Sequence, residues 1–424
     1  MPLPLISGKQ SIFGGGMENG WICERDRSSG RSFGRWKSIF LLEESNPESV
    51  FMKFLFPFLR AFCGVSLCAA LILFLLPSDA GAEVVLPDPD GKPADVNKPV
   101  KVFLIMGQSN TLEMGRVKGN KEGSLEHAIH KEDLYPFMVD EAGKWTRRMD
   151  VRNVHTMGSG GPGGRGGVRR NDWLTVSGGK IGIEMGIGHQ LGNAVDEPVL
   201  ILKSAIGNRS LGWDLLPPGS PRHEVETTDR KTGRKVTLVT PGYNDEVRHP
   251  SWTKGEVPDP PKHNWHAGLQ FEGDVARAKK VLSDLPQYYP GGPLLSGLPA
   301  YEVVGFLWWQ GDKDRYNAAH AAMYEKNLTQ LFKALREEFD APKAKMVVAT
   351  LGQTNKDTAK GNEKLIIDGM FAFGDAHKGE VAIVYTHPLS MGGASNSHYG
   401  GNAKTYMNVG LSMGGAMVKL MKEK

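Results

Sequence analysis

The sequence predicts an α/β fold built around a mainly parallel sheet. Five apolar runs suited to buried strands recur along the chain; they are Val100–Met106, Pro198–Ala205, Glu302–Trp309, Lys345–Leu351 and Val381–Tyr385. Apolar side chains repeat at helical spacing over Tyr316–Phe339 and again over Asn402–Met421. Strands that alternate with helices in this way are typical of βαβ units, whose successive strands run parallel.

The first run, Val100–Met106, contains the β-branched and aromatic residues that suit a strand covered on both faces. It ends in the small polar segment Gly107–Asn110. Glycine allows the chain to turn sharply there, which leaves the hydroxyl of Ser109 exposed at the carboxyl edge of the sheet. This is how a serine nucleophile is displayed, although a Ser after a strand is also a common helix N-cap.

The later elements follow in order. Tyr316–Phe339 stops near Pro342 and is expected to be a crossover helix, while Asn402–Met421 is expected to pack back on the sheet with its methionines in the core. Trp308 and Trp309 are adjacent on one strand, so only one of them can face a crevice. Burial in the core is favoured for both over stacking on a sugar.

Two long segments do not fit the alternation. Gly158–Gly179 and Pro217–Pro261 are rich in Gly, Pro and charge, and are predicted to be insertions or active-site loops. The run Gly160–Gly167 lacks the Lys-Ser/Thr ending of a phosphate-binding loop and does not directly follow a predicted strand, which argues against phosphate binding.

A secretory signal is expected over residues 52–82. Lys53 and Arg60 supply positive charge, Ala61–Leu76 is almost wholly apolar, and Ala80-Gly81-Ala82 offers small residues at cleavage spacing. The mature chain then starts near Glu83 and is secreted or periplasmic. The alternative is an uncleaved membrane anchor, because the apolar run is close to the lower limit for a spanning helix.

The remaining regions follow from that assignment. Residues 1–51 show no helical or strand period, and are expected to be an incorrectly assigned start or a disordered leader. Residues 83–99 form a linker, and residues 100–424 are ample for one large domain with insertions. Once the signal is cleaved, no stable membrane partner is expected.

Composition excludes several classes of protein. All three cysteines, Cys23, Cys63 and Cys68, precede the expected cleavage site, so a disulfide scaffold, a thiol enzyme and a thiolate zinc site are excluded. The formal charge is +4 with scattered basic residues, which predicts no nucleic-acid partner. His263 and His266 have no carboxylate at ligand spacing, so no metal site is expected.

Ser109 needs a base and donors for an oxyanion. The base candidate is His398, in a loop just before the last helix, because an imidazole titrating near neutrality can take the serine proton and return it to a leaving alcohol. A capping or solvent-facing histidine is the alternative. Gly207 and Gln310 each follow a predicted strand, and with the backbone amide of Ser109 they are candidates for the oxyanion hole.

Taken in order, these motifs resemble the SGNH hydrolases. The motifs are Gly107-Gln108-Ser109-Asn110, the Gly207-Asn208 turn, Trp309-Gln310-Gly311-Asp312 and His398-Tyr399. More narrowly, they resemble the sialate O-acetylesterase-like branch, grouped with carbohydrate esterase family six and including acetylxylan esterases. The resemblance covers roughly residues 100–422. It implies a three-layer α/β/α sandwich with a flavodoxin-like five-stranded parallel core.

The same resemblance assigns roles to residues. It implies that Ser109 is the nucleophile, that His398 is the base, and that Gly207, Gln310 and the amide of Ser109 form the oxyanion hole. Asn110 and Asn208 are adjacent candidates for supporting roles.

Three departures from the family pattern matter. The aspartate usual three residues before the histidine is Ser395, so the acid of the triad is missing from its expected place. A backbone carbonyl, Ser395 itself or a carboxylate from elsewhere can accept the imidazole N–H instead, and Asp312, which replaces the family's usual glutamate in Gln-Gly-Glu, is the nearest motif carboxylate. Thr111 replaces a usual methionine, and Gly115 comes later than expected, so the substrate contacts near Ser109 are left open.

The expected function is a carbohydrate O-acetylesterase that hydrolyses acetyl esters on glycans through a serine acyl-enzyme, without a cofactor. The missing aspartate motivates an alternative, a catalytically impaired relative that binds acetylated or acidic glycans. A lipid or aryl esterase on the same fold is less favoured, because the insertions are polar. The resemblance does not fix which sugar carries the ester.

Overall fold

The computed structural model describes residues 86–229, 232–261, 265–292 and 300–423. The expected leader and signal segment, with the three cysteines, lie outside the described residues. Chain contacts divide the protein into residues 1–76 and 77–424, and the second unit holds every residue described below. Among the described helices, none combines the length and the hydropathy that crossing a membrane requires.

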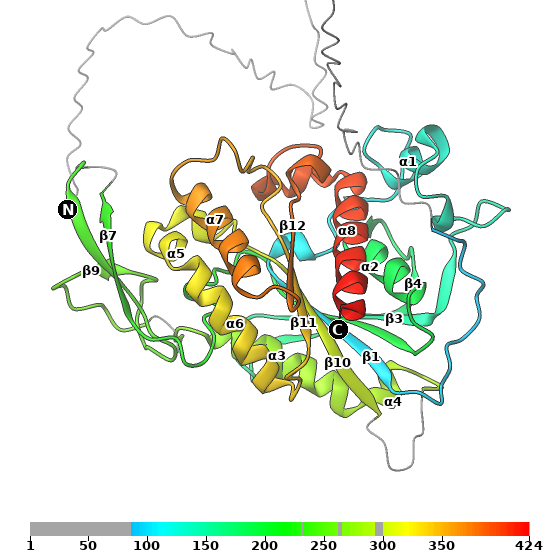
Figure 1. The fold of residues 1–424 in the computed structure, drawn as a ribbon, viewed down its shortest axis with the longest axis horizontal. Helices are drawn as coiled ribbons and strands as arrows, with labels where there is room; N and C mark the ends of the chain where they lie inside the picture. Colours follow the sequence, from blue (N-terminus) through cyan, green and yellow to red (C-terminus); the bar gives the residue numbers. More distant parts are fainter. Residues whose placement is uncertain (1–85, 230–231, 262–264, 293–299, 424) are drawn as a thin grey trace, which may run out of the picture. The chain divides into compact units, whose positions relative to one another are not determined.

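The five predicted strands are confirmed and form one parallel array (Figure 1). They are β1 (Val100–Gly107), β6 (Val199–Ser204), β10 (Tyr301–Trp309), β11 (Lys345–Ala349) and β12 (Val381–Val384). Their spatial order is β6-β1-β10-β11-β12, and every neighbouring pair is parallel. The second of the five thus lies outside the first while the others follow on the opposite side, which is the flavodoxin-like arrangement.

Two further strands extend the sheet beyond β6. They are β3 (Arg147–Gly158), parallel to β6, and β4 (Gly166–Thr175), antiparallel to β3 at the edge. Within Gly158–Gly179, predicted to be an insertion or active-site loop, residues Gly166–Thr175 thus form a strand rather than a loop. Charged residues at the exposed edge hid the strand pattern, and such residues are how a sheet edge is protected from pairing with another chain.

The glycines of this segment serve the hairpin between β3 and β4. A Cβ on Gly166 would lie 2.6 Å from the Cα of Gly158, which is too close for any side chain. The Gly-rich run therefore lets the two strands approach each other.

Helices cover both faces of the sheet, so the three-layer α/β/α sandwich is confirmed (Figure 1). One face carries α3 (Leu269–Ser283), α4 (Leu285–Tyr288), α6 (Tyr324–Glu338) and α7 (Gly361–Ala376). The other carries α1 (Leu125–Glu132), α2 (Glu184–Gly192) and α8 (Ala403–Lys422). Side chains of β1 alternate between the two cores: Leu104 and Met106 pack on the first face, and Phe103 and Ile105 on the second.

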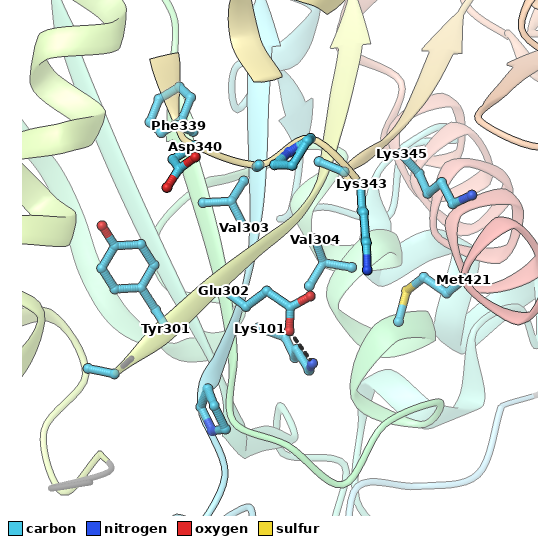
Figure 2. Close-up of a pocket in the computed structure, with 15 residues that line it drawn as sticks. Lys101, Tyr301, Glu302, Val303, Val304, Phe339, Asp340, Lys343, Lys345 and Met421 are labelled. Atoms are coloured by element: carbon cyan, nitrogen blue, oxygen red, sulfur yellow. Dashed lines mark hydrogen bonds and ion pairs between the residues drawn. The ribbon is translucent and has the colours of Figure 1, made fainter. Parts of the chain in front are cut away.

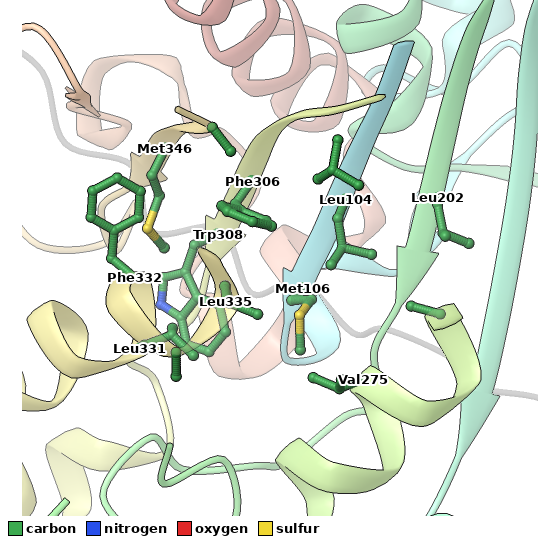
Figure 3. Packing of buried hydrophobic residues seen from close by; sticks show 14 of the residues in the cluster. Leu104, Met106, Leu202, Val275, Phe306, Trp308, Leu331, Phe332, Leu335 and Met346 are labelled. Atoms are coloured by element: carbon green, nitrogen blue, oxygen red, sulfur yellow. The ribbon is translucent and has the colours of Figure 1, made fainter. Parts of the chain in front are cut away.

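The tryptophan pair follows the same alternation. Trp308 belongs to the core under α6, where Leu331 and Phe332 also pack (Figure 3), and Trp309 belongs to the opposite core. Their exposed fractions are 1% and 0%, so neither is placed to stack on a sugar. The interpretation of both as core residues is confirmed.

Both predicted helical segments are confirmed in outline. Residues 316–339 contain the short α5 (Ala318–Ala322) and then α6, and the last segment is α8, whose methionine stripe is largely buried. Asn402 caps α8, because its side-chain oxygen accepts a hydrogen bond from the N–H of Lys404.

Residues 217–261 form a small sheet of their own. Its antiparallel strands are β7 (His223–Thr228), β8 (Lys235–Thr240) and β9 (Trp252–Thr253). Val225 and Leu238 pack against Ala319 and Met323 at α5. A two-stranded pair, β2 (Gly115–Arg116) with β5 (Lys180–Ile181), completes the described strands.

Candidate active site

The sequence motifs meet at the carboxyl edge of the parallel sheet. Ser109 follows β1, Gly207 follows β6 and Gln310 follows β10, and these three strands are neighbours with β1 in the middle. The strand order reverses here, and the crevice outside the carboxyl ends of the strands at such a point is where α/β proteins bind ligands.

Glycines bring the backbone close to Ser109. Gly107 has φ +145°, and a Cβ on it would lie 2.5 Å from the carbonyl oxygen of Trp309. A Cβ on Gly207 would lie 3.2 Å from the Cβ of Ser109, so the loop after β6 touches the serine. The backbone N–H groups of Ser109 and Gly207 donate no hydrogen bond to any described group, which leaves two donors beside the hydroxyl.

The segment that carries His398 lies against the nucleophile turn. Ser109–Thr111 forms the short turn η1, and it contacts Ser395–Gly401, the segment η5. His398 and Tyr399 both have φ +51°, a left-handed conformation that costs a non-glycine residue about 1–3 kcal/mol. Backbone strain of this kind clusters at functional sites.

Tyr399 anchors this strained segment. Its ring stacks on Trp309 with 5.6 Å between centroids, and its hydroxyl accepts a hydrogen bond from the N–H of Gly352 at 3.1 Å. Burial of the Tyr399 ring raises the pKa of its hydroxyl, which therefore stays neutral. These contacts offset the strain and hold His398 next to η1. The His398 ring itself makes no hydrogen bond with a described group.

A carboxylate lies beside the position of the missing aspartate. Oδ1 of Asp312 accepts a hydrogen bond from Oγ of Ser395 at 2.5 Å and another from Nε of Arg315 at 2.8 Å. Oδ2 of Asp312 accepts none from the described residues. Asp312 is mostly buried, and Arg315 balances its charge. A carboxylate with one free oxygen therefore lies beside the segment that carries His398.

Gln310 is at its predicted position, but its amide is already engaged. Nε2 lies within donating distance of three acceptors, Oδ2 of Asp314 at 2.5 Å, the carbonyl of Arg209 at 2.8 Å and Oε1 of Gln108 at 3.2 Å, which share its two hydrogens. Oε1 accepts from the hydroxyl of Tyr324 at 2.9 Å. The role of Gln310 as an oxyanion donor stays a prediction, and in this arrangement its bonds hold the loop that follows Gly207.

The two asparagines have different surroundings. Asn110 is buried, and its Oδ1 has no hydrogen-bond partner among the described residues. Asn208 is exposed with φ +58°, at the turn just after Gly207. Both adjoin the candidate nucleophile or its neighbouring loop. Their supporting roles stay predictions.

A buried ionic cluster that the sequence motifs did not predict lies behind the nucleophile turn. Lys203 on β6 is fully buried, and its Nζ lies 2.6 Å from Oε2 of Glu184 and 3.6 Å from Oε1 of Glu113. His155 and Arg170 also face Glu113, at 3.3 and 3.6 Å. The signal in the sequence was a lysine inside the apolar strand Val199–Ser204, since such a charge needs a partner.

Replacing Lys203 with methionine is expected to lower the free energy of unfolding by about 3–5 kcal/mol, because the buried Glu184 then loses its cation and Glu113 keeps only Arg170 and His155. Urea unfolding at pH 7 measures the change. Lys364→Met is the matched control: Lys364 pairs with Asp368 at 2.8 Å on an exposed helix surface, and its loss should cost about 0.5 kcal/mol or less. Equal effects of the two variants would contradict a structural role for the cluster.

The cluster also predicts a dependence of stability on pH. Burial alone raises the pKa of Glu113, but Lys203, His155 and Arg170 outweigh it and hold this pKa well below its ordinary value of 4.5. A lowered folded-state pKa gives stability that is complete above the ordinary value and is lost as the pH falls below it.

The difference in unfolding free energy between the wild type and Glu113→Gln should therefore be constant near neutral pH. It should shrink as the pH falls from about 5 towards 3. Chemical unfolding at a series of pH values measures it. A difference that does not change down to pH 3 would show that the pKa of Glu113 is not lowered in the folded protein.

Two pockets lie at different places relative to the candidate active site. A pocket of about 830 Å³ is lined by Lys101, Tyr301 and Glu302 (Figure 2), and these residues begin β1 and β10, at the sheet edge opposite Ser109. A smaller pocket of about 370 Å³ is lined by Ser159 and Ile206, next to Gly207. Only the smaller pocket is lined by a residue of the loop that leads into Gly207, and neither lining includes Ser109 or His398.

Comparison with known proteins gives one family match. Residues 265–419 match the family described as "Carbohydrate esterase, sialic acid-specific acetylesterase". This range contains Gln310, Asp312, Ser395 and His398, and it begins after Ser109 and Gly207. A search of curated protein sequences found no match.

Several solved structures are similar at low identity. A protein from Arabidopsis thaliana is 14% identical with a TM-score of 0.41, over 76% of this chain and 99% of the other. A carbohydrate acetylesterase from Xanthomonas citri is 12% identical with a TM-score of 0.38, over 73% and 54%. NanS is 13% identical with a TM-score of 0.37, over 69% and 78%.

Proposed function

We propose that this chain hydrolyses acetyl esters on glycans through Ser109, and the match of residues 265–419 to a carbohydrate esterase family supports the proposal. The observation that carries the proposal is the placement of Ser109. Ser109 follows the central strand, the loop at Gly207 touches it, the N–H groups of both residues donate to no described group, and the segment bearing His398 lies against the turn that Ser109 begins.

The reaction proceeds in two steps. His398 takes the proton of the Ser109 hydroxyl as the oxygen attacks the acetyl carbonyl, and then gives the proton to the departing sugar oxygen. Water hydrolyses the acetyl-enzyme with His398 again as base, which releases acetate and frees Ser109. The N–H groups of Ser109 and Gly207 stabilise the negative charge on the carbonyl oxygen in both steps.

Asp312 supplies the carboxylate that orients His398. This assignment is supported by its bond to Ser395, which occupies the place of the usual aspartate, and by its free Oδ2. Holding the imidazole N–H on a carboxylate fixes the tautomer that presents a free nitrogen to the serine. Asp312 acts through His398 and is therefore a positioning residue.

The test is acetate release by the purified protein from O-acetylated sialic acids, acetylated xylan and a chromogenic acetate. A fluorophosphonate probe, followed by peptide mass spectrometry, identifies the nucleophile. We expect release from at least one glycan and labelling of Ser109. Glycan binding without acetate release or labelling would favour the impaired glycan-binding relative. Release from the chromogenic acetate alone would place the substrate outside the glycans.

We also propose that the protein is secreted or periplasmic through a signal at residues 52–82. The support is the charge and apolar pattern of that segment. N-terminal sequencing of the protein recovered outside the cytoplasm is expected to begin near Glu83. A chain that keeps residues 52–82 and fractionates with membranes would support the anchor instead.

A further inference from the structure

Gln108 is the residue before the nucleophile, and only the oxygen of its side-chain amide is hydrogen-bonded. Its Oε1 accepts hydrogen bonds from the N–H of Lys313 at 3.1 Å, from Nε2 of Gln310 at 3.2 Å and from the N–H of Gly311 at 3.4 Å. Backbone N–H groups only donate, so the oxygen of the amide must face them. The orientation of the Gln108 carboxamide is therefore fixed by its surroundings.

The other end of the same amide is unused. Nε2 of Gln108 donates to no described group, although the side chain as a whole is only 2% exposed. This nitrogen is not sealed from solvent, so it retains some solvent contact. A donor that is buried without any partner costs about 1–3 kcal/mol. Contact with solvent spares Nε2 of Gln108 this cost.

Gln310 has the opposite arrangement. Its amide hydrogens are shared among Asp314, the carbonyl of Arg209 and Oε1 of Gln108, and its oxygen accepts from Tyr324. Asp314 is fully buried and also accepts the N–H groups of Leu211 and Gly212, in the loop that begins at Gly207. Gln310 therefore links the loop after β6 to Gln108.

We infer that Gln108 supplies the side-chain donor to the reacting ester and that Gln310 is the positioning residue that aligns it. This inference rests on the proposed esterase function. Nε2 of Gln108 donates to the acetyl carbonyl oxygen as negative charge develops there, together with the N–H groups of Ser109 and Gly207. No bond of Gln310 has to break during the reaction.

The test uses Gln108→Glu, which keeps an oxygen for the backbone N–H groups and replaces the donor by a carboxylate. At pH 8 we expect kcat/KM to fall by about 10²–10³-fold, the usual effect of losing one oxyanion donor. A protonated carboxyl can donate again. The ratio of variant to wild-type kcat/KM should therefore rise as the pH falls, which a purely structural role would not produce.

Two further variants complete the experiment. Gln108→Met removes the donor without adding a titrating group, so its loss should be similar and the ratio should not change with pH. Gln287→Glu makes the same chemical change at an exposed position and should match the wild type. Thermal unfolding confirms that each variant is folded. If Gln108→Glu unfolds, Gln108→Met carries the test.

The outcomes separate this inference from the function on which it rests. Wild-type activity that Ser109→Ala abolishes, with Gln108→Glu and Gln108→Met both within threefold of wild type, overturns the role of Gln108 alone. Activity that survives in Ser109→Ala overturns the proposed nucleophile. Absence of any wild-type activity overturns both.

Discussion

Ser109→Ala is expected to lower kcat on the preferred acetylated glycan by about 10⁶-fold, the scale seen when a serine enzyme loses its nucleophile. Without the hydroxyl no acetyl-enzyme forms, and the donors around Ser109 can only assist direct attack by water. Binding should persist, because the alanine leaves the N–H groups of Ser109 and Gly207 in place. Acetate release and calorimetric binding of the same glycan measure the two effects.

The structure offers a control for this variant. Ser283 lies at the end of α3, where its exposed hydroxyl donates to the carbonyl of Lys280. Ser283→Ala should leave kcat unchanged. Ser109→Ala activity within tenfold of the wild type would mean that another group attacks the ester.

The main sheet was predictable because its strands are buried on both faces. Val100–Met106 and its four counterparts are continuous apolar runs, and the residues that follow them must share one edge of the sheet. The opposite holds for β4, which lies at the sheet edge and carries exposed charged residues in place of a continuous apolar run. Gly158 of β3 faces Gly166 of β4, and in the sequence this close approach appeared only as a Gly-rich loop.

The sequence predicted where the candidate site residues lie in the fold, but not which hydrogen bonds and packing contacts they make. Ser109, Gly207 and Gln310 could be placed at strand ends, but the bonds that occupy the amide of Gln310 depend on Asp314 and Tyr324 in folded space. The left-handed turn at His398 is also set by distant packing, the ring of Tyr399 on Trp309. Local sequence carries no signal for such contacts.

Asp312→Asn is expected to lower kcat by about 10⁴-fold, the loss seen when a histidine base adopts the wrong tautomer. An amide keeps the shape of the carboxylate and can still accept the hydroxyl hydrogen of Ser395. It provides no negative charge for the imidazolium, and its NH₂ group favours the tautomer that cannot accept the serine proton. The KM for the glycan should change little, because Asp312 acts through His398.

Relocating the acid provides the decisive comparison. Ser395→Asp restores the family's usual acid. The double variant Asp312→Asn with Ser395→Asp should therefore be at least tenfold more active than Asp312→Asn alone. Ser395→Ala keeps Asp312 and should cost less than tenfold. The steady-state kcat values of the wild type, Asp312→Asn, the double variant and Ser395→Ala measure these effects.

Two outcomes would reject the role of Asp312. One is Asp312→Asn activity within threefold of the wild type, which would mean that another group orients His398. The other is a large loss that Ser395→Asp does not repair, accompanied by a lower unfolding temperature. That result would point to the ion pair with Arg315, in which Oδ1 of Asp312 lies 2.8 Å from Nε, as the main function of this carboxylate.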